Sequence, residues 1–339
     1  MVERVAVIGA GAWGTTVAAL VAGKAPTVLW ARRPGLAAAI SETGENPDRL
    51  PGVALPPSLR ASASLAEAVG DATLVVMAVP SHGFREVMAA VAAEIGPGVP
   101  VVSLAKGLEG GTNRRMTEVV TEEAPGRPVG VLTGPNLAGE ISAGQPGAGV
   151  VAMSDEASAE RVQHLVMTDR FRIYTNQDVL GCEVAGVTKN VLALAAGMVA
   201  GLGFGDSSMA GIITRGLAEL GRLVVAMGGE RMTVAGLAGI GDLVATCTSP
   251  LSRNRTTGEL LGRGTALAEI LADRPMVAEG VKTARPLVEL AAGYGVEMPI
   301  GEMVVGVLEG VLTPAEGIRT LMERAPRAEF DRRPTGSRP

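Results

Sequence analysis

The chain has 339 residues, 47% of them hydrophobic, and a formal net charge of −5. Its length predicts about two domains, and the acidic balance excludes the basic surface with which nucleic-acid-binding proteins meet phosphates. No basic stretch followed by an apolar one opens the chain, and no apolar run reaches about 18 residues without a charge, so we expect neither a signal peptide nor a membrane span. These features predict a cytoplasmic protein with no nucleic-acid partner and no integral membrane association, in which Cys182 and Cys247 are buried thiols.

The first half of the chain alternates short apolar runs with helical patterns. Short apolar runs that alternate with helices favour a parallel, doubly wound sheet covered on both faces. Strand signals lie within residues 4–11, 27–30, 65–80, 99–107, 127–135, 148–154 and 170–176, and helical signals at 13–24, within 65–80 and at 85–95.

After about Asn176 the strand signal stops. Helices are expected at 178–202, 207–228, 258–271, 281–295, 301–310 and 313–324, with Thr313 as the N-cap of the last. The fold class is therefore α/β plus all-α: a Rossmann-type domain over 1–177, an all-helical substrate and catalytic domain over 178–326, and a disordered tail over 327–339. Ligands of such sheets bind at the carboxyl ends of the strands, here facing the helical domain.

Three glycines follow the first strand. Gly9, Gly11 and Gly14 have the Gly-x-Gly-x-x-Gly spacing, after a strand and at the start of a helix, which is the context of a dinucleotide-binding fingerprint. Gly9 permits the tight turn, Gly11 lets the backbone approach a pyrophosphate, and Gly14 allows close contact between helix and strand. The helix N-terminus offers unpaired N–H groups to the phosphates.

The end of the second strand bears on the choice of cofactor. NAD-binding units usually carry an acid there for the ribose hydroxyls, whereas Ala31, Arg32 and Arg33 follow the strand TVLW. No acid repels a 2′-phosphate, and two guanidinium groups can pair with one. The sequence therefore favours NADP(H), with NAD(H) as the second choice. The alternative is that both arginines are exposed loop charges.

The segment EVAGVTKNVLALAAG places one ammonium group in an apolar helix. Lys189 is the only charged residue between Val184 and Val199, and alanines flank it on a helical wheel, which leaves room for a ligand. Asn190 falls on another side, with Glu183. A buried ammonium must be paired or lose its proton more easily, and a lysine of lowered pKa can act as a general acid–base. The alternative is that Lys189 reaches the surface by its long stem.

Other polar residues follow strand or helix signals. Lys106 comes just past a buried strand, Asn136 follows Gly134 at another strand end, and Asp242 stands at a helix start framed by glycines. A phosphate dianion would need a forked donor supported by further N–H or O–H groups. The segment SPLSRNR offers such a set in Ser252, Arg253 and Asn254.

These motifs together resemble the bacterial-type NAD(P)-dependent glycerol-3-phosphate dehydrogenases. The matching segments run in order over nearly the whole chain and include VIGAGAWGTTVA, LVVMAVPSHGF, AKGLE, GPNLAGE, EVAGVTKNVLALAAGMVAGLGFGDSSMAGIITRGLAE, GIGDLVATCTSPLSRNRTTGELLGRG and AEGVKTA. Two departures are mild: Asn136 stands where the family often has Ser, and Trp13 where another aromatic occurs.

The resemblance implies reversible reduction of dihydroxyacetone phosphate to sn-glycerol 3-phosphate, which supplies glycerophospholipid synthesis. Lys189 would handle the proton on the substrate C2 oxygen, Lys106 would add positive field, and Asp242 would orient Lys189. Substrate contacts are implied for Lys106, Gly134, Asn136, Lys189, Asp242, Ser252, Arg253 and Asn254. Cofactor contacts beyond the three glycines are implied for Ala12, Trp13, Arg32, Arg33, Lys106, Ala138, Arg253, Val277 and Glu279.

Two other functions stay open at this point. A ketopantoate reductase or 3-hydroxyacid dehydrogenase-like enzyme would share the fold and a Lys–Asn pair on a helix, although a simple carboxylate substrate would not need the donors of SPLSRNR. A non-catalytic NADP-sensing protein would keep the glycine-rich loop but would need neither Lys189 nor Arg253. The oligomeric state is not fixed by the sequence, although an apolar helical domain often carries a homodimer face.

Overall fold

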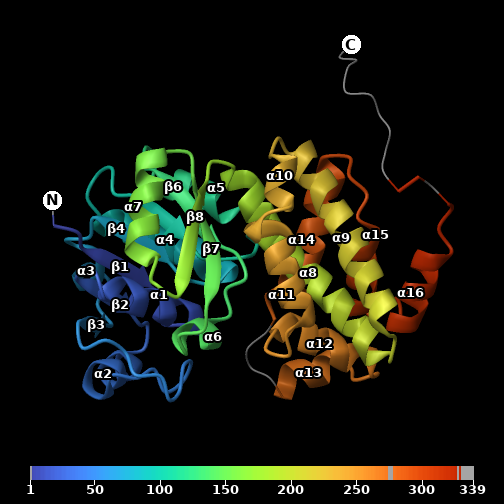
Figure 1. The fold of residues 1–339 in the computed structure, drawn as a ribbon, viewed down its shortest axis with the longest axis horizontal. Helices are drawn as coiled ribbons and strands as arrows, with labels where there is room; N and C mark the ends of the chain where they lie inside the picture. Colours follow the sequence, from blue (N-terminus) through green and yellow to red (C-terminus); the bar gives the residue numbers. More distant parts are fainter. Residues whose placement is uncertain (1, 274–277, 327, 330–339) are drawn as a thin grey trace, which may run out of the picture.

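The computed structural model describes residues 2–273, 278–326 and 328–329. Figure 1 shows a sheet with its helices, coloured blue to green, beside a bundle of helices coloured yellow to red. The predicted fold class, a Rossmann-type sheet followed by a helical domain, is confirmed. Of the predicted tail, residues 327 and 330–339 lie outside the described residues.

Eight strands form one sheet in the order β3-β2-β1-β4-β5-β6-β7-β8. The strands from β3 to β6 in this order are parallel, β7 is antiparallel to β6, and β8 is parallel to β7. The strands are β1 (Val5–Ile8), β2 (Thr27–Trp30), β3 (Leu59–Ser62), β4 (Leu74–Met77), β5 (Val101–Ser103), β6 (Val129–Thr133), β7 (Gly147–Met153) and β8 (Phe171–Asn176).

The prediction of a wholly parallel sheet is wrong at β7 and β8. A parallel connection must carry the chain back along the full strand, usually through a helix. Only α6 (Ala138–Ser142), of five residues, lies between β6 and β7, and at about 1.5 Å of rise per residue it is too short for that task. Strand β3 was not predicted, because this edge strand carries the exposed Arg60 in place of an apolar run.

Helices cover both faces of the sheet. One face packs against α1 and α7 through residues such as Val17 and Val162, and the other packs against α4 and α5 through Phe84 and Val119. Besides α6, these helices are α1 (Ala12–Ala22), α2 (Pro34–Thr43), α3 (Leu65–Val69), α4 (Phe84–Glu94), α5 (Met116–Glu123) and α7 (Glu156–Val166), with a 3₁₀ turn η1 (Ser81–Gly83).

The helical part begins directly after β8. Its elements are α8 (Val179–Gly201), α9 (Asp206–Ala226), α10 (Arg231–Val234), a π-helical turn η2 (Leu237–Gly241), α11 (Asp242–Thr248), α12 (Arg253–Gly262), α13 (Leu267–Asp273), α14 (Glu279–Gly293), α15 (Pro299–Leu308) and α16 (Pro314–Met322). The helix predicted over 258–271 is divided because Gly264 adopts a φ of +91°. Thr313 caps α16 as predicted, in a reciprocal capping box with Glu316.

Helix α8 is the centre of the helical part. Every residue from Gly181 to Val199 is buried, and the core around α8 includes Val131 of β6 and Val150 of β7. Among the described residues, α8 is the only single helix whose length and composition would allow it to cross a membrane. However, 89% of its most apolar 18-residue stretch is buried inside the protein. It is therefore a core helix shared by both parts of the fold.

Helices α8 and α12 approach each other through glycines. A Cβ at Gly197 would lie 2.0 Å from the carbonyl oxygen of Arg255, and a Cβ at Gly258 would lie 2.1 Å from that of Leu194. Side chains at either position would force the backbones apart. This contact fixes the N-terminus of α12, and with it the SPLSRNR segment, against α8.

Candidate functional site

The glycine-rich turn joins β1 to α1. Gly9 has a φ of +122°, and a Cβ there would lie 2.6 Å from the carbonyl oxygen of Ala78, while a Cβ at Gly14 would lie 2.2 Å from that of Gly9. A Cβ at Gly11 would meet nothing within 4 Å. Packing therefore explains Gly9 and Gly14, whereas Gly11 borders open space. Helix α1 starts at Ala12 with no side-chain cap and no acid in its first turn, so its N–H groups are available to an anion.

The predicted contacts around this turn differ in their surroundings. Trp13 packs edge-on against Phe171 at 6.0 Å between ring centroids, and its buried Nε1 has no partner among the described residues. Arg33 is exposed and forms an ion pair with Asp48. Arg32 is also exposed, and no carboxylate in the described part of the chain pairs with it. Arg32 is thus the freer of the two guanidinium groups for a 2′-phosphate.

Two lysines meet on one carboxylate where the two parts of the fold join. Lys106 Nζ lies 2.6 Å from Asp242 Oδ2, and Lys189 Nζ lies 2.9 Å from Asp242 Oδ1. Lys106 follows β5, Lys189 belongs to α8, and Asp242 is the first residue of α11. Lys106 Nζ also donates to the carbonyl oxygen of Gly134 at 2.9 Å. Since β5 and β6 are parallel, this cluster lies at the carboxyl edge of the sheet, where ligands of doubly wound folds bind.

Burial and charge set the protonation of this cluster. Burial would raise the pKa of Asp242, but the two ammonium groups together hold it below its usual range. Burial lowers the pKa of Lys106 to about 8; Asp242 opposes this change and the positive charge of Lys189 adds to it. Lys106 therefore changes charge near neutrality. Lys189 is paired, and with 8% of its surface exposed it does not reach the solvent by its stem.

Thr246 also belongs to the cluster, although the sequence did not single it out. Lys189 Nζ donates to Thr246 Oγ1 at 2.7 Å, and Thr246 lies 2.7 Å from the carbonyl oxygen of Asp242. Residues four apart on a helix share a face, so its position after Asp242 was an available signal. With Asp242 and Thr246, Lys189 holds two bonds and keeps one N–H for another partner.

Asn190 is engaged on the other side of α8. Its Nδ2 donates to the carbonyl oxygen of Lys106 at 2.9 Å and lies 3.4 Å from a carboxylate oxygen of Glu279. Its Oδ1 accepts a bond from Asn254 Nδ2 at 2.9 Å, and Asn254 Oδ1 accepts one from the N–H of Gly280. Asn190 and Asn254 thus link α8, α12 and α14, and only one N–H of Asn254 is left for a substrate.

The loop after β6 brings a polar side chain without partners. Both amide atoms of Asn136 are buried and unpaired among the described residues, and its backbone N–H bonds to Gly134, whose φ is +118°. An unsatisfied buried amide costs about 1–3 kcal/mol. Asn136 therefore fits a ligand that supplies both a donor and an acceptor.

The SPLSRNR donors gather at the start of α12. Ser252 is its N-cap: Oγ accepts a bond from the N–H of Arg255 at 3.2 Å, so its own hydroxyl proton can be donated. Arg253 is exposed. Glu279 begins α14, where burial raises its carboxyl pKa against the opposing charge of Arg253. Ala138 is the first residue of α6, and Val277 lies outside the described residues.

Comparison with known proteins gives a uniform result. The family described as NAD-dependent glycerol-3-phosphate dehydrogenase N-terminus matches residues 4–159, and the corresponding C-terminus family matches residues 178–319. Proteins named glycerol-3-phosphate dehydrogenase [NAD(P)+] from Thermobifida fusca and Sphingopyxis alaskensis are each 52% identical, over 96% and 94% of this chain and 98% and 96% of their own length.

Solved structures agree in fold. A crystal structure of glycerol-3-phosphate dehydrogenase from Coxiella burnetii is 35% identical with a TM-score of 0.91, covering 95% of this chain and 99% of that one. A ketopantoate reductase from Ralstonia eutropha matches with a TM-score of 0.58 at 16% identity, over 93% of this chain and 100% of its own, and so shares the fold alone.

Proposed function

The chain belongs to the NAD-dependent glycerol-3-phosphate dehydrogenase family, and on that premise we propose that it catalyses the reversible reduction of dihydroxyacetone phosphate to sn-glycerol 3-phosphate with NAD(P). The observation that carries the site assignment is the cluster of Lys106, Asp242 and Lys189 at the carboxyl edge of the sheet. Two cationic groups held on one carboxylate are preorganised for one developing negative charge. We further propose a cytoplasmic enzyme whose product supplies glycerophospholipid synthesis.

Lys189 is the proton donor in the direction of reduction. As C2 of the ketone gains a hydride, negative charge develops on the C2 oxygen, and the free N–H of the Lys189 ammonium gives its proton to that oxygen. In the reverse direction the neutral amine removes the same proton. Asp242 and Thr246 fix the direction of Nζ through their bonds at 2.9 and 2.7 Å. Lys106, on the other carboxylate oxygen, adds positive field at the same point.

The phosphate of the substrate is held at the start of α12. The N-terminus of this ten-residue helix presents N–H groups and the positive end of its dipole. Arg253 supplies a forked charge, and Ser252 and Asn254 supply an O–H and an N–H. Asn136, whose amide lacks partners, is the polar contact that we assign to the other end of the substrate.

The residues around the glycine-rich turn fit a dinucleotide. Gly11 leaves free the space that a Cβ would occupy, and the uncapped start of α1 faces it. We assign the pyrophosphate to this turn, with Ala12 and Trp13, and a 2′-phosphate to Arg32, which favours NADP(H) over NAD(H). Arg33, Ala138 and Glu279 are further proposed contacts. When bound, the reduced nicotinamide supplies the hydride.

Steady-state kinetics test the function and its alternative together. We expect turnover of dihydroxyacetone phosphate and none of ketopantoate, with a higher kcat/KM for NADPH than for NADH. Ketopantoate turnover would overturn the substrate, and a clear preference for NADH would overturn the role of Arg32. Tight NADPH binding without turnover of either ketone would point to a sensing protein.

The Lys189→Ala variant tests the proton donor. Loss of general acid catalysis typically costs about 10²–10⁴-fold in rate, so kcat should fall by that amount while the Kd for NADPH stays the same. A fall of kcat by less than tenfold would show that another group moves the proton. Cofactor affinity serves as the control, because Lys189 lies on α8 and the glycine-rich turn lies between β1 and α1.

The division of labour and the assembly of the protein are also proposals. We assign cofactor binding mainly to residues 1–177 and substrate chemistry to 178–326. We expect a homodimer through the helical part, where Ile240 and Val244, one turn apart, are exposed apolar side chains. Light scattering at micromolar concentration distinguishes a dimer of this chain from a monomer.

A further inference from the structure

Helix α8 carries a buried carboxylate that the proposed mechanism does not use. Glu183 is 3% exposed and lies seven residues before Asn190, which is two helical turns and the same face. Asn190 holds the carbonyl oxygen of Lys106. Lys189 faces Asp242 instead. One face of α8 thus bears two polar side chains separate from the catalytic one.

Glu183 forms hydrogen bonds with the start of α5. Its Oε1 accepts a bond from the N–H of Thr117 at 3.0 Å, and its Oε2 accepts bonds from Thr117 Oγ1 at 2.6 Å and Arg115 Nη1 at 3.0 Å. The N–H groups at a helix N-terminus have no partner within the helix, and the Glu183 carboxylate accepts a bond from one of them, that of Thr117. Arg115 and Glu183 form a buried ion pair at 3.0 Å, and removing one charge of such a pair leaves the other without compensation. The junction therefore holds both partners in place.

The junction is connected to Lys106 through the backbone. Arg115 pairs with Leu108 in an antiparallel bridge, and the N–H of Glu109 bonds to the carbonyl oxygen of Arg114 at 2.9 Å. Leu108 is buried in the core around α8, and Lys106 comes two residues before it. The segment 106–117 is therefore held by α8 at both ends, by Asn190 at Lys106 and by Glu183 at Arg115 and Thr117.

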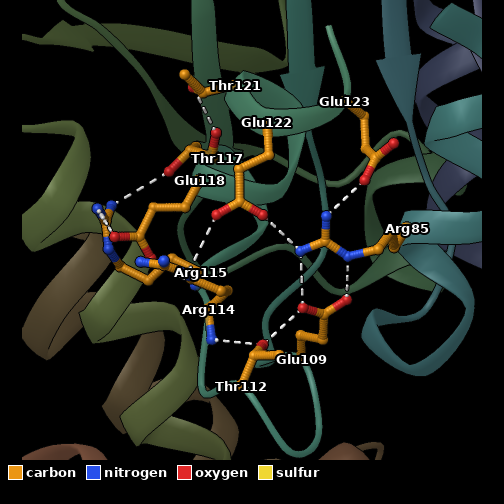
Figure 2. A network of polar contacts seen from close by, with 10 residues as sticks. All are labelled: Arg85, Glu109, Thr112, Arg114, Arg115, Thr117, Glu118, Thr121, Glu122 and Glu123. Atoms are coloured by element: carbon orange, nitrogen blue, oxygen red, sulfur yellow. Dashed lines mark hydrogen bonds and ion pairs between the residues drawn. The ribbon is translucent and has the colours of Figure 1, made fainter. Parts of the chain in front are cut away.

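The tip of this segment is held differently, by a charge network at the surface. Figure 2 shows Arg85 bonded to Glu109, Glu122 and Glu123, with Arg114 beside Glu122. The Arg85 side chain is 34% exposed, and ion pairs that reach the solvent hold their partners less firmly than buried ones. The surface network attaches the turn at Glu109 to α4 and α5. The buried Glu183 junction, in contrast, sets the distance of the segment 106–117 from α8.

We propose that Glu183 is a positioning residue for Lys106: by holding Arg115 and Thr117 it fixes the segment 106–117 on α8, and so fixes Lys106 Nζ against Asp242 and the substrate. This rests on the proposed function. One helix then sets the position of both lysines, directly for Lys189 and through Glu183 and Asn190 for Lys106.

The Glu183→Gln variant tests the proposal, with Glu219→Gln as the matched control. Glu219 is also 3% exposed, and it also accepts bonds from N–H groups at a helix N-terminus, those of Ile300 and Gly301 at the start of α15. It lies on α9, and its hydrogen bonds go to the start of α15 rather than to the segment 106–117. Both variants therefore replace by an amide a buried carboxylate that accepts bonds at a helix N-terminus.

For Glu183→Gln we expect kcat/KM for dihydroxyacetone phosphate to fall at least tenfold, with the Kd for NADPH unchanged within twofold. We also expect the alkaline limb of the kcat/KM profile to move upward by half a pH unit or more, because a loosened Lys106 is less desolvated. Glu219→Gln should keep the wild-type kcat/KM and alkaline limb.

The outcomes separate the two proposals. If the wild type turns over the ketone and both variants keep its kcat/KM and pH profile, Glu183 is only structural and the inference fails. If the wild type does not turn over the ketone, the proposed function fails first. Should Glu183→Gln not fold, Thr117→Val keeps side-chain volume and removes the two bonds of the Thr117 hydroxyl, the one it donates to Glu183 Oε2 and the one it accepts from Arg115 Nη1. An unchanged kcat/KM and alkaline limb in that variant would equally overturn the inference.

Discussion

Lys106 is the residue of the site whose charge changes in the working pH range. Burial brings its pKa to about 8, so in the free enzyme the ammonium is lost above that pH. Because we assign its positive field to the developing charge on the substrate, kcat/KM for reduction should fall about tenfold per pH unit above about 8. Initial rates between pH 6 and 10 at saturating NADPH measure this limb.

A Lys106→Arg variant is the control for that assignment. The guanidinium stays charged at every pH of the assay, so its alkaline limb should vanish or move well above pH 9, even where the absolute rate falls. If wild type and variant share the same limb, another group titrates and Lys106 is not the source.

At this scale the sequence predicted residue types better than their partners. The isolation of Lys189 in an apolar helix showed that it needs a partner, and Asp242 is that partner. The sequence did not show which distant residues come into contact. Asp242 also pairs with Lys106, which is 136 positions away along the chain. The lowered pKa of Lys106 arises from its burial, and burial depends on the packing of distant segments, which the sequence alone does not state.

At the scale of elements, the contact of α8 with α12 places the phosphate donors. In Gly258→Ala the new Cβ would lie 2.1 Å from the carbonyl oxygen of Leu194, so α12 must move outward. Overpacking of this kind costs about 1–3 kcal/mol, and the shift carries Ser252 and Arg253 with it. We expect a lower Tm and a KM for dihydroxyacetone phosphate raised several-fold, measured by thermal unfolding and initial rates.

Gly211→Ala is the matched control for that change. Gly211 lies inside α9, and a Cβ there meets nothing within 4 Å. Since alanine favours a helix over glycine by about 1 kcal/mol, this variant should gain stability and keep its KM. An unchanged KM in Gly258→Ala would show that the start of α12 does not depend on the contact with α8.

Elements were predictable where a continuous apolar segment marked them. Strand β2 falls at the predicted residues, and α8 begins and ends within one residue of its prediction. The direction of β7 was not, because it depends on how short α6 is rather than on any pattern within β7. Likewise, the polar residues of β3 do not form a strand pattern in the sequence. This edge strand is defined by its pairing with β2.

At the scale of the whole molecule, Glu219 links stability to pH. Burial raises its pKa to about 7 from an ordinary value of 4.5, so the folded state binds more protons than the unfolded state between these values. The free energy of unfolding should therefore fall as pH rises from about 4.5 to about 7, by about 3.5 kcal/mol from this group at about 1.4 kcal/mol per pKa unit.

Chemical denaturation at a series of pH values measures this effect. Relative to Glu219→Gln, the wild type should lose stability steadily across that window and keep a constant difference above about pH 8. A difference between the two proteins that does not change with pH would show that Glu219 ionises normally when folded.

The core around α8, which takes in Val131 and Val150 of the sheet, also has a consequence for the order of events during synthesis. A chain that has left the ribosome as far as Asn176 contains all eight strands, but Lys106 has neither Asn190 to hold its carbonyl nor Asp242 to take its charge. Asp242 emerges 53 residues after Lys189. The chain thus becomes catalytically competent late in synthesis, when Asp242 has been made and can pair with Lys106 and Lys189.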